Sequence, residues 1–152
     1  MRATILAVGR LRDPMIDGLV QQYRQRCPMI APIVVVESRK RPDDPSRRDD
    51  EARLLLAKVP GGARMVALDE RGRQFTSVEF AGQMGAWRDQ GIREVAFLIG
   101  GADGHGGAVI ERVDLGLALG KMTWPHLFVR AMLAEQLYRA STILAGHPYH
   151  RA

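Results

Sequence analysis

The sequence has few of the residues on which disulfide-bonded, zinc-binding and membrane proteins depend. Its single cysteine, Cys27, excludes an intramolecular disulfide and a cysteine-based zinc cluster, and is typical of a small core residue in a reducing compartment. No apolar run reaches the roughly 18 residues of a membrane span, and charged residues appear too early in the chain for a signal peptide. We therefore expect a soluble, cytoplasmic protein without a membrane partner.

Two familiar nucleotide-binding loops are also missing. The chain has no Gly-Lys-Ser/Thr, which excludes a phosphate-binding P-loop, and no Gly-x-Gly-x-x-Gly after its first apolar run. An ordinary dinucleotide-binding fold therefore does not match the sequence.

Lysine is scarce, because all but three of the 22 basic residues are arginine. With 17 acidic residues the net charge is +5. Arginine makes bidentate contacts with phosphate and stacks on bases, which favours a polyanionic partner. A GC-rich genome would raise the ratio of arginine to lysine in the same way, so the charge alone favours nucleic acid only weakly.

The apolar residues are arranged as short runs separated by helical patterns. A chain of 152 residues with 46% hydrophobic residues fits one packed domain, which we expect to span residues 1–152. The expected strands are residues 4–8, 32–37, 63–68, 94–99 and 115–119. Strands that alternate with helices predict an α/β fold with a mostly parallel sheet and helices on both faces.

The expected helices carry recognisable start signals. One begins at Asp13 and Pro14, a second covers about residues 47–58, and a third runs from a capping box of Thr76 and Glu79 to about residue 90. The last, residues 126–145, is apolar most of the way round and carries three charged residues: Arg130, Glu135 and Arg139. Such a helix is buried on more than one side, and we expect another subunit to cover the second side.

A glycine-rich loop follows the fourth predicted strand. Residues 99–107 hold five of the 16 glycines. The loop lies at the carboxyl end of a parallel strand, where open α/β sheets bind ligands, and glycines let a ligand approach the backbone closely. The alternative is a flexible turn without a ligand.

The C-terminal residues 147–151 read His-Pro-Tyr-His-Arg, and three of the four histidines lie at 126, 147 and 150. Histidines can bind a transition metal, but no carboxylate or cysteine lies near these in sequence, and we expect no metal. A tail of aromatic, histidine and arginine side chains also suits an RNA base and its phosphates. A surface tail without function is the third interpretation.

Taken together, these segments resemble the RlmH family, bacterial large-subunit pseudouridine methyltransferases of the SPOUT superfamily. The resemblance covers nearly the whole chain, and the glycine loop together with the tail makes it specific. The segments that carry it are residues 6–9, 66–69 with Gly72, 97–104, 124–126 with Val129 and Arg130, 134–140 and 147–151.

The resemblance implies a C-terminal trefoil knot, a homodimer that pairs through the last helix, and S-adenosyl-L-methionine as the cofactor. It also implies three cofactor-binding loops, formed by Leu68, by Gly100 and Gly101, and by Gly120, Lys121, Met122, Thr123, Trp124 and Pro125. Lys121 departs from the small or apolar residue expected there, and an outward side chain would accommodate it. A Cβ at Gly101 is expected to intrude between backbone and ligand.

The implied reaction transfers a methyl group to N3 of a pseudouridine in 23S rRNA, within the assembled 70S ribosome. The N3 proton must leave, so either a base accepts it or nearby positive charge makes the imide more acidic. The candidates are His126, Arg130, Arg139, Tyr149, His150 and Arg151. We assign Arg139 and Arg151 to a phosphate or to the imide anion. No single base is named, because arginine stays protonated and either histidine, His126 or His150, could accept the proton.

The tail and Arg139 are expected to reach the target base beside a cofactor that the partner subunit binds. Two alternatives stay open from the sequence: a non-catalytic RNA-binding or ribosome-associated factor, and a SPOUT methyltransferase that acts on transfer RNA.

Overall fold

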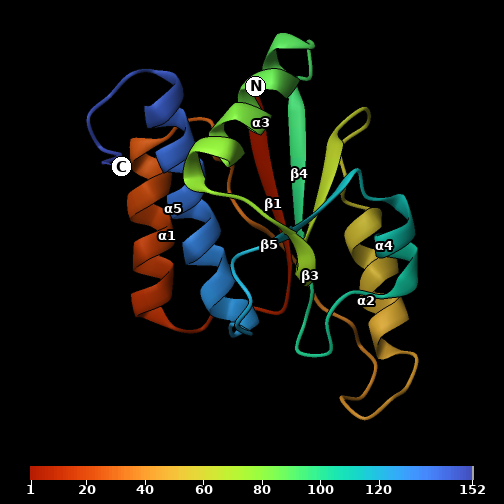
Figure 1. Ribbon diagram of the computed structural model, residues 1–152. Coiled ribbons are helices and arrows are strands. Elements are labelled where there is room, and N and C mark those ends of the chain that lie inside the picture. The colour runs from red at the N-terminus through yellow and green to blue at the C-terminus, as the bar shows by residue number, and fades with distance from the viewer. Residues whose placement is uncertain (152) are drawn as a thin grey trace.

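The computed structural model describes residues 1–151, and its centre is a five-stranded sheet (Figure 1). The strands are β1 (Arg2–Val8), β2 (Val34–Val36), β3 (Arg64–Gln74), β4 (Glu94–Ile99) and β5 (Leu115–Ala118). The helices are α1 (Pro14–Arg26), α2 (Arg47–Leu56), α3 (Ser77–Asp89), α4 (Gly107–Arg112) and α5 (His126–Leu144). The strand order is β2-β1-β4-β3-β5, and every neighbouring pair is parallel.

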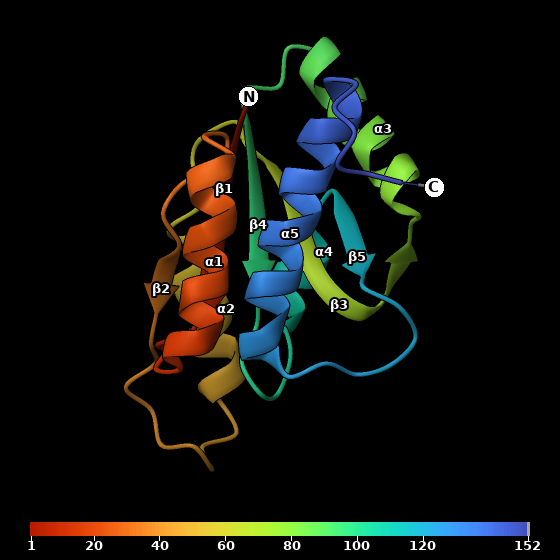
Figure 2. The same cartoon turned by 90° about the vertical axis from the view of Figure 1, so that its left-hand side faces the viewer.

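Helices cover both faces of this sheet, as predicted. Helices α1, α3 and α5 lie on one face, and α2 and α4 lie on the other (Figures 1 and 2). The side chains of successive strand residues point to opposite faces. In β1 and β4, Ile5 and Phe97 accordingly pack with the three-helix layer, and Leu6 and Leu98 pack with the two-helix layer. Buried on both faces, these strands are the continuous apolar runs of the sequence.

Two predicted helix starts are confirmed in detail. The Asp13 side chain accepts hydrogen bonds from the backbone N–H groups of Met15 and Ile16, and Pro14 is the first residue of α1. At α3, the Thr76 hydroxyl accepts from the backbone of Glu79 at 3.1 Å, and the Glu79 carboxylate accepts from the backbone of Thr76 at 2.7 Å. Both caps satisfy N–H groups that have no partner inside the helix.

β3 is longer than predicted, because it continues through polar residues to Gln74. Leu68 and Arg73 both have Leu117 of β5 as their register partner, so residues 69–72 leave the ladder between them. Gly72 then passes close to β5, since a Cβ at this position would lie 2.6 Å from the backbone carbonyl carbon of Gly116. The predicted strand ended at residue 68, because the apolar run ends there and the extension is mostly polar.

β2 is shorter than predicted, with three residues in place of residues 32–37. It is an edge strand that pairs only with the last part of β1. The trefoil knot stays a prediction. Of the described helices, none is long and apolar enough to cross a membrane.

Candidate active site

A cavity of about 830 Å³ lies at the carboxyl edge of the sheet, where the segments after β3, β4 and β5 meet the first turn of α5. Its volume is in the range of small-molecule sites. Residues 68, 100 and 101 line it together with five residues of the segment after β5: Gly120, Met122, Thr123, Trp124 and Pro125. Lys121 is exposed and is not part of the lining. The segments that follow β3, β4 and β5 are far apart in sequence, yet together they form one wall of this cavity.

Glycines shape this wall through the backbone. Gly104 and Gly120 have φ values of +75° and +105°, in the left-handed region that favours glycine. A Cβ at Gly100 would lie 2.9 Å from the carbonyl carbon and oxygen of Gly104, so the turn after β4 closes only without a side chain there.

For Gly101 the structure gives a different reason from the expected one. A Cβ at this position would lie 3.1 Å from the Glu51 carboxylate and 3.2 Å from Val8. The side chain would therefore press on α2 and β1, because the loop packs closely against the protein here. The expected intrusion between backbone and ligand stays a prediction.

The residues that leave the β3 ladder add charge to the cavity. Asp69, Glu70 and Arg71 all line it, and none was among the predicted site residues. The Thr123 hydroxyl donates to the Glu70 carboxylate at 2.5 Å, which connects β3 to the segment after β5. Burial acts to raise the pKa of Asp69, but hydrogen bonds from Arg71 outweigh it and hold that pKa below its usual range. Asp69 is therefore ionised and paired with Arg71, and Glu70 adds a second carboxylate to this side of the cavity.

His105 is a second lining residue that sequence reasoning missed, although it lies inside the predicted glycine loop. Its side chain is buried, with Nε2 3.0 Å from the carbonyl oxygen of Leu98. Nδ1 is enclosed and has no hydrogen-bond partner among the described residues. Burial lowers the pKa of His105, which favours the neutral imidazole.

His126 begins α5 and also lines the cavity. Burial, and then the positive charge of Arg130, lower the pKa of His126, so its imidazole is neutral at pH 7 and can accept a proton. Arg130 itself is fully buried, and its Nη2 donates to the backbone carbonyls of Val8 and Gly9. Arg130 therefore connects α5 to the end of β1, and its candidate role in the loss of the N3 proton stays a prediction.

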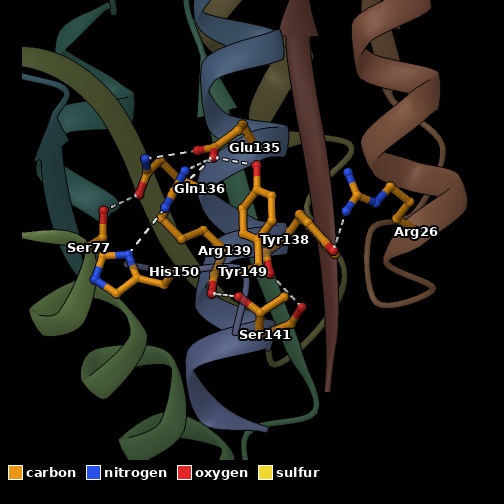
Figure 3. Close-up of polar contacts among 10 residues, drawn as sticks. Arg26, Ser77, Glu135, Gln136, Tyr138, Arg139, Ser141, Tyr149 and His150 are labelled. Atoms are coloured by element: carbon orange, nitrogen blue, oxygen red, sulfur yellow. Dashed lines mark hydrogen bonds and ion pairs between the residues drawn. The ribbon is translucent and has the colours of Figure 1, made fainter. Parts of the chain in front are cut away.

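Three of the other predicted catalytic residues, Arg139, Tyr149 and His150, gather near the C-terminal end of α5 (Figure 3). Arg139 Nε and Tyr149 Oη each donate to Glu135 Oε1 at 3.0 Å. His150 Nδ1 lies 3.2 Å from Arg139 Nη1. Burial, the neighbouring Tyr23 hydroxyl and Glu135 together raise the pKa of Tyr149 to about 12. Glu135 and Arg139 form an ion pair that raises the pKa of Arg139.

Within one chain these two groups of residues are far apart. His126 and Arg139 are separated by 13 residues of one helix, which is about 20 Å along its axis at about 1.5 Å per residue. The structure thus places His126 with the predicted cofactor residues, and Arg139, Tyr149 and His150 in a separate cluster. Arg151 is exposed at the end of the described chain.

A second cavity, of about 520 Å³, lies between α1, α5 and the turn from β3 to α3. It shares Leu117, Leu119 and Gly120 with the first cavity, so the β5 segment separates the two. Its rim includes the partly exposed Phe128, and Glu135 connects its wall to the tail cluster. No group of three or more His, Cys, Asp or Glu side chains in residues 1–151 could hold a metal ion.

A family model described as "Predicted SPOUT methyltransferase" matches residues 1–150. The chain belongs to the SPOUT methyltransferase family. The segments that carried the resemblance in the sequence, residues 66–69, 97–104 and 124–126, supply most of the cavity wall of this SPOUT chain.

Relatives with full-length similarity narrow the family further. The chain is 53% identical over 151 residues to ribosomal RNA large subunit methyltransferase H of Paramagnetospirillum magneticum, with 99% of each chain covered. It is also 53% identical over 152 residues to the protein of that name from Rhodospirillum centenum, with both chains covered completely. The protein of that name from a Bradyrhizobium species is 44% identical over 161 residues. The resemblance to the RlmH family is therefore confirmed.

Proposed function

We propose that this protein is an rRNA methyltransferase that uses S-adenosyl-L-methionine to methylate N3 of a pseudouridine in 23S rRNA. The observation that carries the proposal is the cavity, in which three loops and His126 converge at the carboxyl edge of the sheet. Full-length identity to large-subunit RNA methyltransferases supports the same reaction and substrate class.

The residues of the cavity fit such a cofactor. Leu68, Ile99 and Leu117 provide apolar surface for an adenine ring, and the glycine-rich turns bring backbone polar groups to the wall. Asp69 and Glu70 place negative charge beside a ligand that carries a sulfonium and an ammonium group. When bound, S-adenosyl-L-methionine supplies an electrophilic methyl group on sulfur, so the chain needs to align the acceptor and exclude water.

The N3 proton of the target base needs an acceptor, and the structure narrows the candidates. Tyr149, whose pKa is raised to about 12, keeps its proton at neutral pH and acts as a hydrogen-bond donor. His126 lines the cavity and is neutral at pH 7, so we assign it the role of proton acceptor. Arginine side chains stay protonated, and Arg139 and Arg151 are assigned to phosphate or to the developing imide anion.

The separation of the two clusters supports a homodimer with a shared site. A two-fold axis that pairs α5 with α5 in opposite directions would bring the tail of one subunit to the cavity of the other. The second cavity and the partly exposed Phe128 and Leu19 give α5 and α1 an uncovered apolar surface for this pairing. We propose that Arg139, Tyr149, His150 and Arg151 act on the target base beside the cofactor of the partner subunit.

The substrate is proposed to be the assembled 70S ribosome in the cytoplasm. The chain has four Phe, three Tyr and two Trp for base stacking, and the SPOUT family model matches residues 1–150. Contacts with phosphate provide affinity without sequence information. Selection of one nucleotide therefore relies on the shape of a preassembled surface.

The proposal is tested with purified protein, labelled S-adenosyl-L-methionine and three substrates: 70S ribosomes, naked 23S rRNA and transfer RNA. Label on the ribosome, located by mass mapping to N3 of one pseudouridine, is the expected result. Preference for transfer RNA would identify a different SPOUT activity, and cofactor-independent RNA binding without transfer would identify a non-catalytic factor. Light scattering at micromolar protein should give twice the mass of one chain, and a fully active monomer contradicts the shared site.

A further inference from the structure

Glu135 is the residue to which the whole tail cluster is attached, and no role in the reaction has been assigned to it above. Its Oε1 accepts hydrogen bonds from Arg139 and from Tyr149, while its Oε2 accepts from Gln136 Nε2 at 2.9 Å. Gln136 in turn accepts from the Ser77 hydroxyl of α3 at 2.9 Å. Figure 3 shows that the tail, α5 and α3 meet in this one set of contacts.

The ion pair with Glu135 determines how Arg139 uses its five N–H groups. Nε and Nη2 donate to Glu135, which fixes one edge of the planar guanidinium. Nη1 then faces His150 Nδ1 at 3.2 Å. One N–H on Nη1 and one on Nη2 are left for a substrate. Arg139 is therefore an oriented donor whose charge is balanced by Glu135.

The contact with Arg139 also fixes the proton on the His150 ring. A guanidinium can only donate, so Nδ1 must accept and must be unprotonated. The ring proton of the neutral imidazole is then on Nε2. In this arrangement His150 offers an N–H donor to a base oxygen or a phosphate.

Tyr149 is held by its ring as well as by its hydroxyl. Its ring packs edge-to-face on Tyr138, with centroids 4.6 Å apart. The Arg139 guanidinium lies 4.8 Å from the Tyr149 ring centre, and Arg26 donates to the Tyr138 hydroxyl at 2.7 Å. Aromatic and cation–π contacts of this kind hold the ring in place, and Glu135 anchors the Tyr149 hydroxyl and Arg139 together.

We propose that Glu135 is a positioning residue that makes Arg139 and His150 a pair of oriented hydrogen-bond donors and holds Tyr149 beside them. Arg139 and His150 then present N–H groups, which match the carbonyl oxygens of a uracil-type ring and the negative charge that develops when N3 loses its proton. The single O–H of Tyr149 is donated to Glu135, so its ring and hydroxyl oxygen face the substrate side without a donor. Because this inference rests on the proposed function, its experiment combines a readout of activity with a readout of the free protein.

The free-protein readout is the His150 ring proton. In protein labelled with ¹⁵N at histidine, NMR at pH 7.5 distinguishes the two neutral tautomers, and the spectrum of His150→Gln assigns the His150 signal. Wild-type protein should show His150 protonated on Nε2 alone. Glu135→Gln places an amide NH₂ against other donors, either Gln136 Nε2 or the groups of Arg139 and Tyr149. Arg139 is then no longer held against His150 Nδ1, so His150 should become a mixture of the two neutral tautomers.

The activity readout uses 70S ribosomes and S-adenosyl-L-methionine. Glu135→Gln should lower kcat by roughly 10- to 100-fold, while KM for the cofactor stays within about twofold, because Glu135 is not part of the first cavity's lining. Glu111→Gln, the same change at an exposed position of α4, is the control and should behave as wild type.

Two results would overturn the inference: a His150 that carries its proton on Nδ1 in the wild type, or a Glu135→Gln variant with wild-type kcat. If wild-type protein transfers no methyl group to any RNA, the proposed function fails. The tautomer of His150 in the wild type and in Glu135→Gln still decides the positioning role of Glu135 in that case.

Discussion

The two ends of α5 are built in opposite ways. At the N-terminal end, His126 lies beside a cavity formed largely by glycine-rich backbone, in which Gly100 and Gly104 close one turn. At the C-terminal end, the cluster around Glu135 consists of side chains joined by an ion pair, hydrogen bonds and aromatic contacts. The first end therefore depends on backbone shape, and the second depends on the chemistry of individual side chains.

Deletion of residues 147–152 removes the tail from the second end and should have the largest effect. We expect methylation of 70S ribosomes to fall below detection, because Tyr149, His150 and Arg151 are lost together. Dimer mass by light scattering and cofactor affinity by calorimetry should match the intact protein, since none of residues 147–151 lines the first cavity. Wild-type methylation by the truncated protein would remove the tail from the mechanism.

Gly100→Ala changes the cavity at the N-terminal end of α5 and leaves the cluster around Glu135 as it is. The added Cβ meets the Gly104 backbone at 2.9 Å, so the turn after β4 must open. We expect cofactor affinity to fall by roughly 100-fold, because small displacements of a binding loop are costly, while the His150 tautomer stays as in the wild type. Gly107→Ala is the matched control at the first residue of α4, directly after this loop, since a Cβ there has no neighbour within 4 Å. Calorimetry with unaltered affinity in Gly100→Ala would contradict a backbone-shaped site.

Gly72→Ala tests whether the long β3 needs close contact with β5. Its Cβ would lie 2.6 Å from backbone of Gly116, and backbone cannot move aside as a flexible side chain can. The free energy of unfolding should fall by about 3 kcal/mol, as for severe overpacking. Gly116→Ala is the control on the opposite strand of the same pair. A Cβ at Gly116 would lie 3.5 Å from the Gly72 Cα, which is an ordinary contact. Urea unfolding should show a much smaller change for this variant.

His105→Leu should have the smallest effect of these changes. It should alter how the stability of the fold depends on pH. The pKa of His105 is lowered in the folded protein, so the unfolded chain takes up the proton first as the pH falls below about 6.5. Folding stability is then full above that pH and is lost as the pH falls through the folded pKa. His126 has a shift of the same sign. Between pH 7 and 5 the variant should lose less stability than the wild type in thermal unfolding. Equal losses would show that His105 does not contribute to the pH dependence of stability.

Much of the fold was predictable because buried parallel strands are uninterrupted apolar runs. Residues 94–99 and the start of β1 illustrate this, and the Thr76 capping box located α3 to within a residue. The end of β3 was not predictable in this way, since residues 69–74 are mostly polar and are held by contact with β5. The complete burial of Arg130 was missed for a similar reason, because its partners are backbone carbonyls, which leave no mark in the sequence.

The site was predictable in part. The glycine loop and the segment after β5 came from composition and from the family resemblance, and the structure brings them to one cavity. Glu135 was visible only as a charge on an apolar helix, since its role depends on a tail folded back against it. The distance between His126 and Arg139 follows from their positions on one helix. The sequence does not show that His126 lies at the first cavity and Arg139 in the cluster around Glu135, and these places give the distance its meaning.

The segment formed by Leu117, Leu119 and Gly120 is a wall common to both cavities. A ligand in one cavity and an occupant of the other therefore act on the same stretch of chain. If binding on one side changes the preferred position of this wall, the two equilibria are thermodynamically linked, and each changes the other by the same factor. In a dimer, a bound cofactor would then change the association constant of the subunits by some factor. Association of the subunits would change the binding constant of the cofactor by that same factor. Under that condition, assembly and ligand binding become reciprocal quantities across one thin partition.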